Sequence, residues 1–144
     1  MVGLLRLFIL FTFTKSHIRM EQREQIIKNY IEAYNNFDVE GMVADFDETI
    51  KFENVSDGKV NLTIKGLEAF REQAEKAKMI FSTRKQTILS FNHTEKETEI
   101  DISYDAIVAM DLPNGLKKGD EVKLQGKSIF KFLDGKICKL TDIS

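Results

Sequence analysis

Two long alternating segments in the C-terminal half of the chain place the strongest constraint on its fold. Residues 97–110 have apolar side chains at nearly every even position and acidic or polar ones at the odd positions. Residues 121–133 alternate in the same way, with lysine and glutamine on the odd side. A period of two predicts strands with one face in the core. Because strands of about 5–6 residues are usual, strands twice as long must twist and curl, and a strongly bent sheet is expected.

The residues around these strands predict helices first and a meander last. Apolar residues three and four apart predict three helices, expected over Glu21–Phe37, after a cap at Asp38, and from Gly66 to Phe81. Three further strands are expected, over Thr49–Val55, Arg84–Asn92 and Lys136–Ile143. The last of these follows an Asp134-Gly135 hairpin turn. This order predicts the α+β class, with three N-terminal helices packed in a strongly curved antiparallel sheet.

The first nineteen residues differ in character from the rest of the chain. Their apolar run, Leu4–Phe13, contains Arg6 and is too short to span a membrane, and no small-residue cleavage site follows it. Three interpretations stay open: a gene start placed upstream of the true one at Met20, a weak signal or anchor, and a structural element. Residues 1–19 are therefore treated as an extension, and residues 20–144 as a single domain.

Composition limits the classes of function. With 144 residues, 42% of them hydrophobic, the chain can form one soluble domain with a real core. A net charge of −2 and the lack of a basic stripe argue against a nucleic-acid partner. Cys138 is the only cysteine, which excludes an intrachain disulfide and a thiolate zinc cluster. We expect no metal, no cofactor, no membrane span and a cytoplasmic location, or a secreted or periplasmic one if residues 1–19 act as a signal.

The polar faces of the two long segments are complementary in charge. The first carries Asp101 and Asp105, and the second carries Lys123 and Lys127. If the two strands pair, acidic and basic side chains oppose each other on the outer face of the sheet. Two interpretations stay open for this face: a solvated surface that discourages random association, or a dimer interface.

Five polar side chains interrupt the apolar stripes that should face the core. They are Tyr30, Tyr34, Asn54, Tyr104 and Ser128. A buried polar group costs free energy unless it is hydrogen-bonded, so each either pairs inside the core or lines a cavity. Ligand sites are mostly apolar with a few convergent polar groups, and these five residues come from separate elements. We therefore predict them as ligand-binding residues.

A set of short motifs runs along the same region. They are YIEAYNNFD at 30–38, GMVADF at 41–46, KFEN at 51–54, KGLEAF at 65–70 and FKFLDGKI at 130–137. With these motifs, residues 22–143 resemble the nuclear transport factor 2-like superfamily, in its SnoaL-like and ketosteroid-isomerase-related branch. The resemblance implies a cone-shaped, cystatin-like fold with an apolar cavity between sheet and helices. It also implies a homodimer that uses the sheet.

The resemblance also implies candidate catalytic residues. Ketosteroid isomerases use a tyrosine and a protonated aspartic acid as an oxyanion hole, and a second aspartate to move the proton. Matched by motif, Tyr30 occupies the tyrosine position, Ser128 falls near the oxyanion-hole acid, and Asn54 stands where the proton-moving aspartate would be. Asparagine cannot act as a general base near neutral pH. SnoaL-like cyclases also use an acid/base carboxylate, for which Asp142 is the nearest candidate, although alternation does not settle which way it points.

Three functions stay open at this point. The first is a module that binds a small apolar molecule through Tyr30, Tyr34, Asn54, Tyr104 and Ser128. The second is an isomerase, cyclase or dehydratase that works by proton transfer, with Tyr30 and Asp142 as catalytic residues. The third is an interaction domain with a filled core that dimerises through its sheet. The sequence names neither the ligand nor the reaction.

Overall fold

The computed structural model describes the backbone of residues 2–144 and the side chains of residues 15, 17 and 19–144. Its helices are α1 (Val2–Asn35), α2 (Val39–Val43) and α3 (Leu67–Lys78). Its strands are β1 (Phe46–Ser56), β2 (Lys59–Lys65), β3 (Phe81–His93), β4 (Glu97–Val108), β5 (Glu121–Leu133) and β6 (Lys136–Ile143). No helix among the described residues combines the length and the apolar character needed to cross a membrane.

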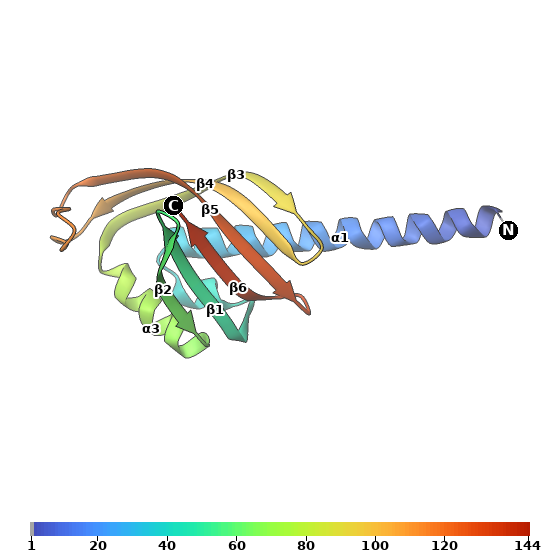
Figure 1. Ribbon diagram of the computed structural model, residues 1–144, viewed down its shortest axis with the longest axis horizontal. Coiled ribbons are helices and arrows are strands. Elements are labelled where there is room, and N and C mark those ends of the chain that lie inside the picture. The colour runs from blue at the N-terminus through green and yellow to red at the C-terminus, as the bar shows by residue number, and fades with distance from the viewer. Residues whose placement is uncertain (1) are drawn as a thin grey trace.

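The six strands form one sheet in the order β2-β1-β6-β5-β4-β3. The β1–β6 pairing is parallel, and the other four pairings are antiparallel. The long strands β3, β4 and β5 arch over α1, and α3 lies beside β1 and β2 (Figure 1). Register shifts within four of the five pairings mark irregularities of the kind that help a sheet bend. The predicted α+β class and the curved sheet wrapped around helices are confirmed. The sheet is mixed and not wholly antiparallel as predicted, because β1 and β6 run in the same direction.

The pairing of β4 with β5 has the predicted charge complementarity. Asp101 lies opposite Lys127, and Asp105 lies opposite Lys123. The Lys127 ammonium is 3.2 Å from Asp101 Oδ1 and 3.4 Å from Glu99 Oε2. The outer face of these strands is therefore covered by ion pairs within the chain. Such exposed pairs contribute little stability, and a one-residue slip of the register would break them.

One strand, β2, has no counterpart in the sequence-based prediction. It forms a hairpin with β1 through Asp57 and Gly58, whose φ angles of 52° and 76° match those of the predicted turn at Asp134 and Gly135, 51° and 77°. Both turns thus use the Asp-Gly pair that tolerates two successive positive φ values. Only Ile64 of β2 is buried, so the strand lacks the apolar alternation that identifies the others.

The helix ends also differ from the prediction. The first helix ends at Asn35 rather than Phe37, because Phe37 adopts a left-handed φ of 58°. The third helix ends at Lys78, and Phe81 begins β3 instead of completing a helical face. At its other end, α1 begins at Val2, and its first half extends well past the sheet (Figure 1).

The core lies between α1 and the inner face of the sheet and is rich in aromatic rings. Tyr30 of α1 stacks on Phe46 at 5.6 Å between centroids and contacts Phe130 edge-on at 5.6 Å. Phe46 in turn contacts Phe70 of α3 edge-on at 4.9 Å. This chain of rings joins α1, β1, β5 and α3, and aromatic pairs of this kind add about 0.5–1.5 kcal/mol each beyond their burial.

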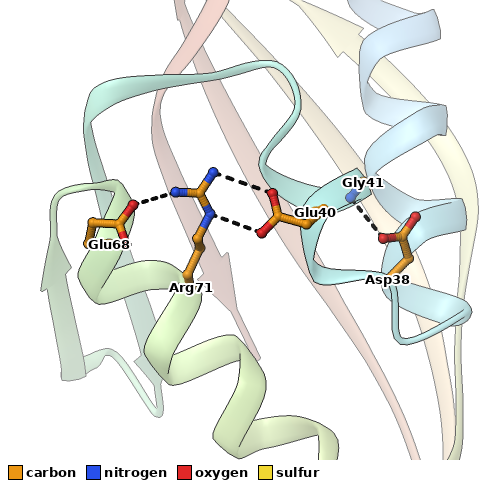
Figure 2. Close-up of polar contacts among 5 residues, drawn as sticks. All are labelled: Asp38, Glu40, Gly41, Glu68 and Arg71. Atoms are coloured by element: carbon orange, nitrogen blue, oxygen red, sulfur yellow. Dashed lines mark hydrogen bonds and ion pairs between the residues drawn. The ribbon is translucent and has the colours of Figure 1, made fainter.

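A surface ion-pair cluster fixes α2 against α3 (Figure 2). Arg71 of α3 pairs with Glu68 on its own helix and with Glu40 of α2, whose Oε1 lies 3.2 Å from Arg71 Nε. Asp38 Oδ1 accepts a hydrogen bond from the Gly41 backbone at 3.0 Å, which caps α2. A Cβ at Gly41 would collide with the Asp38 carboxylate, so the cap requires glycine there.

Arg23 attaches the β3–β4 turn to α1. The residue is 7% exposed, and its Nη1 donates to the Thr94 carbonyl at 2.8 Å, while its Nη2 donates to the Glu95 carbonyl. Its guanidinium also lies 5.2 Å from the centroid of the Phe132 ring. One side chain thereby satisfies two carbonyls of a turn about seventy residues away in sequence.

Replacing Arg23 with methionine is expected to lower the free energy of unfolding by about 1–3 kcal/mol, because the turn carbonyls lose charged donors. Urea unfolding followed by circular dichroism measures the change. The matched control is Arg19→Met, an exposed arginine one turn earlier on the same helix, which should leave stability nearly unchanged. Equal stability of Arg23→Met and the wild type would contradict the assigned role.

Candidate functional site

A cavity of about 190 Å³ lies between α1, α3 and the inner face of the sheet. Its wall is largely apolar, formed by Met42, Phe52, Leu62, Ile64, Phe70, Ala74 and Ala77. Its polar lining consists of Tyr30, Tyr34, Asn54, Gln73, Arg84 and Asp142. A larger open notch of about 670 Å³ lies between α1 and the turns at residues 95–96 and 133–135, and none of the predicted site residues lines it. The smaller cavity is therefore the candidate site.

The sheet register places Asp142 at the centre of the polar lining. Strand β6 lies between β1 and β5, and Asp142 is opposite Asn54 on one side and Ser128 on the other. Ser128 Oγ donates to Asp142 Oδ1 at 2.7 Å. The side chain that alternation left undirected thus points inward and lines the cavity.

Burial raises the pKa of the Asp142 carboxyl to about 6. The hydrogen bond from Ser128 opposes this shift, because a donor to the carboxylate favours the ionised form. No cation neutralises the carboxyl, since it forms no ion pair with a described residue. Asp142 therefore changes charge at a pH close to neutrality.

Two tyrosines from α1 line the same cavity one helical turn apart. Tyr30 is 5% exposed, and burial raises the pKa of its hydroxyl well above the usual value. Burial also raises the pKa of Tyr34, whose hydroxyl lies 2.9 Å from that of Tyr104. Both groups are neutral hydrogen-bond donors at physiological pH. Tyr104 does not line the cavity, and its contact with Tyr34 gives it a supporting position.

Asn54 of β1 lines the cavity, and its side chain contacts Asn61 of β2, the strand that the sequence did not predict. Its Nδ2 donates to Asn61 Oδ1 of β2 at 2.8 Å. An amide donates and accepts hydrogen bonds but takes up no proton near neutral pH. Of the predicted residues, the structure thus brings Tyr30, Tyr34, Asn54 and Asp142 to the cavity. Tyr104 and Ser128 contact residues that line it.

Arg84 is a lining residue that the sequence analysis missed. It is 4% exposed, and its Nε donates to the Tyr34 carbonyl at 2.8 Å. Its guanidinium lies over two rings, 3.8 Å from the centroid of Tyr34 and 4.5 Å from that of Phe37. The available signal was alternation on the predicted strand: residues 84 and 86 share a parity with Ile88, which packs against the core. Gln73 of α3, also missed, has no comparable signal.

Comparison with known families identifies the domain. The family model of the SnoaL-like domain matches residues 27–140. The chain belongs to the SnoaL-like family. No match is found among curated proteins. The polar cavity described above lies within the matched region, except for Asp142, which follows it by two residues.

Solved structures similar to this SnoaL-like chain show the same fold. A proposed polyketide cyclase from Xanthomonas campestris pv. campestris is 17% identical, with a TM-score of 0.73 and coverage of 88% of this chain and 92% of that one. SalBIII, an epoxide hydrolase/cyclase-like enzyme of pyran ring formation in the polyether salinomycin, is 20% identical (TM-score 0.70, coverage 86% and 91%). A protein with a ketosteroid isomerase-like fold from Catenulispora acidiphila DSM 44928 is 12% identical (TM-score 0.66, coverage 81% and 82%).

The arrangement in this SnoaL-like domain suits proton transfer to or from a small molecule. A carboxyl that titrates near neutrality can both accept and return a proton. The hydroxyl of Tyr30 and the amide of Asn54 can donate hydrogen bonds to an oxygen that gains charge. Among the residues whose side chains are described, no group of three or more His, Cys, Asp or Glu is placed to hold a metal ion.

Asp142→Asn is expected to stabilise the fold at pH 7 by about 2–3 kcal/mol and to have little effect at about pH 4. The folded-state pKa of about 6 exceeds the unfolded value of about 3.9, so the native state binds the proton more tightly. Stability from this group is therefore complete below the unfolded pKa and is lost as pH rises through the folded pKa. Urea unfolding at both pH values measures the difference. If Asp142→Asn changes the free energy of unfolding equally at both pH values, the raised pKa of Asp142 is contradicted. The control is Asp105→Asn, which replaces an exposed aspartate.

Proposed function

We propose that this SnoaL-like domain binds a small, largely apolar carbonyl compound in the cavity and moves a proton on it with Asp142 as the acid/base. One observation carries the proposal: a carboxyl with a pKa of about 6 lines a mostly apolar cavity. A catalytic group whose pKa lies near the operating pH is the efficient choice for general acid–base chemistry. The cyclase-like enzyme SalBIII, which shares the fold, offers support by analogy only.

Three lining residues, Asp142, Tyr30 and Asn54, have roles in the proposed step. Ionised Asp142 takes the proton from the carbon beside the carbonyl. The electron pair of that C–H bond forms a C=C bond to the carbonyl carbon, and the π electrons of the C=O bond move onto the oxygen, which gives an enolate. Tyr30 and Asn54 donate hydrogen bonds to this oxygen, Asn54 through the N–H that its contact with Asn61 leaves over. Protonated Asp142 then returns the proton to the same carbon or, in a substrate with a β,γ double bond, to the γ carbon, and the C=O bond re-forms. Ser128 positions the carboxyl through its hydrogen bond and does not touch the substrate.

Binding without turnover is the alternative that the same cavity supports. It requires the lining residues to hold a ligand but gives no role to the raised pKa of Asp142. An interaction domain with a filled core fits less well, because about 190 Å³ between α1, α3 and the sheet is unfilled by side chains. The experiment below therefore separates turnover from binding.

Deuterium exchange at enolisable carbons tests the proposal. Single-ring ketones are incubated with the protein in D₂O, and loss of the α-proton signal is followed by NMR. The wild type should accelerate exchange, and Asp142→Asn should reduce the enzymatic rate by roughly 10²–10⁴-fold, the usual contribution of a general base. The control Asp105→Asn, on the outer face, should keep the full rate. If the wild type accelerates exchange in none of the ketones, the proposed proton transfer is contradicted, and binding without turnover remains.

The pH dependence of exchange gives a second, independent prediction. Because the base must be ionised, the rate should rise as pH increases through about 6 and level off above it. Ser128→Ala should shift this midpoint upward, since it removes the hydrogen bond that favours the ionised form. Tyr30 and Tyr34, which share the cavity with Asp142, have raised pKa values and do not titrate in this range. A rate independent of pH between about 5 and 8 would contradict the role of Asp142.

Homodimerisation through the sheet and a cytoplasmic location remain part of the proposal. The outer face of β4 and β5 carries matched rows of acid and base, such as Asp101 with Lys127, that a second copy could use in exchange. The molar mass measured by light scattering after gel filtration, at low and high salt, tests the dimer. A molar mass equal to that of one chain at low salt would contradict homodimerisation.

A further inference from the structure

Arg84 is a buried cation without an acidic partner. It is 4% exposed, and it forms no ion pair with a carboxylate of any residue whose side chain is described. Its Nε is satisfied by the Tyr34 carbonyl, and its Nη2 has only the sulfur of Met42, at 4.0 Å. Nη1 has no hydrogen-bond partner among these residues. A buried charge normally needs pairing and full hydrogen bonding, so this one is incompletely compensated.

The carbonyl and aromatic contacts of Arg84 come from the C-terminal end of α1 and from Phe37, which follows it. The Tyr34 carbonyl belongs to the last turn of α1, where the helix dipole favours a positive charge. The Tyr34 and Phe37 rings lie against the guanidinium as cation–π partners. These contacts explain how the cation is kept in the fold. None of these contacts is a hydrogen bond from Nη1 or Nη2 to an oxygen, which is the contact that a carboxylate would provide.

Asp142 is not the missing partner. It lines the same cavity as Arg84, but no ion pair joins them, and the pKa of Asp142 is governed by burial and by Ser128. An arginine close enough to pair would hold the pKa of that carboxyl down rather than leave it raised. The cavity thus holds a cation and a titratable acid that do not neutralise each other directly.

The size of the cavity limits which ligand can supply the acidic partner that Arg84 lacks. An engineered apolar cavity of about 150 Å³ holds a benzene molecule. The cavity here, at about 190 Å³, has room for one ring and a small substituent. Its wall includes Phe52 and Phe70, whose own rings lie edge-on at 5.7 Å, and a flat apolar ligand suits such a wall.

We infer that the cavity selects a single-ring-sized ligand that carries a carboxylate, and that the carboxylate pairs with the terminal nitrogens of Arg84. The inference deepens the proposed function by naming the charge and size of the substrate, and it rests on that function. Arginine suits this role because its planar fork binds a carboxylate through two parallel hydrogen bonds. Arg84 is accordingly a specificity-determining residue, distinct from the acid/base.

Binding of benzoate and of benzamide to the full-length protein tests the inference. The two probes share a ring and nearly the same volume, and only benzoate is charged. The dissociation constants are measured by isothermal titration calorimetry at about pH 5. At this pH Asp142 is mostly protonated and does not repel the anion. The wild type should bind benzoate at least tenfold more tightly than benzamide.

Two variants and a control assign the preference to Arg84. Arg84→Met should remove the preference, with the Kd of benzoate rising at least tenfold and that of benzamide changing less than threefold. Arg84→Lys keeps the charge without the fork and should give an intermediate preference, and it remains informative if the methionine variant unfolds. Lys85→Met removes one positive charge from the next residue of β3, whose side chain is exposed, and should keep the preference.

The outcomes separate this inference from the proposed function. Equal binding of both probes by the wild type, or a full preference in Arg84→Met and Arg84→Lys, would overturn the inference while the cavity stays a binding site. Binding of neither probe would overturn it as well, and the exchange experiment with neutral ketones would then decide the proposed function alone. A preference that Lys85→Met removes would mean general surface charge, not Arg84.

Discussion

The geometry of the candidate site depends on the hydrogen bond between Ser128 and Asp142. It exists because β6 lies between β5 and β1, so that one residue of β6 faces Ser128 on one side and Asn54 on the other. The parallel β1–β6 pairing is essential to this arrangement, since it brings the ends of β1 and β6 to the same place. Burial of the Asp142 carboxyl raises its pKa, and the single hydrogen bond from Ser128 opposes this shift only in part.

The site costs the fold stability. Asp142 must ionise while buried, and Arg84 stays charged at 4% exposure without a carboxylate. The core that offsets these costs is the chain of rings from Tyr30 through Phe46 to Phe70, which also forms part of the cavity wall. Buried charge concentrated at one place in an otherwise consistent fold is typical of functional sites.

The sequence predicted the parts of the fold that have strong periodicity. The long strands β4 and β5, their opposed charges and the inward placement of Tyr30 and Asn54 all follow from alternation and helical spacing. Strand β2 was missed because it lies mostly exposed at the sheet edge and has one buried residue, Ile64. Its Asp57-Gly58 turn carried the same signal as the turn that was recognised.

The direction of Asp142 could not be predicted for a different reason. The register between β5 and β6 shifts so that Phe132 faces Ile137 while Lys131 faces Lys139, and Cys138 is the extra residue. Such a bulge changes the parity of alternation, so that Ile137 before it and Leu140 after it both point inward. Asp142 shares the parity of Leu140. The inward cation at Arg84 was overlooked because a charged residue within a strand suggests exposure unless its neighbours on the same face are considered.

An NMR titration of the Asp142 side-chain carboxyl carbon in the isotopically labelled protein measures the pKa of the proposed acid/base directly. We expect a midpoint of about 6, since burial favours the protonated form. A midpoint near 4, the value of a solvated aspartate, would contradict it, because the carboxyl would then be fully ionised at neutral pH and poorly suited to exchange a proton with a ligand.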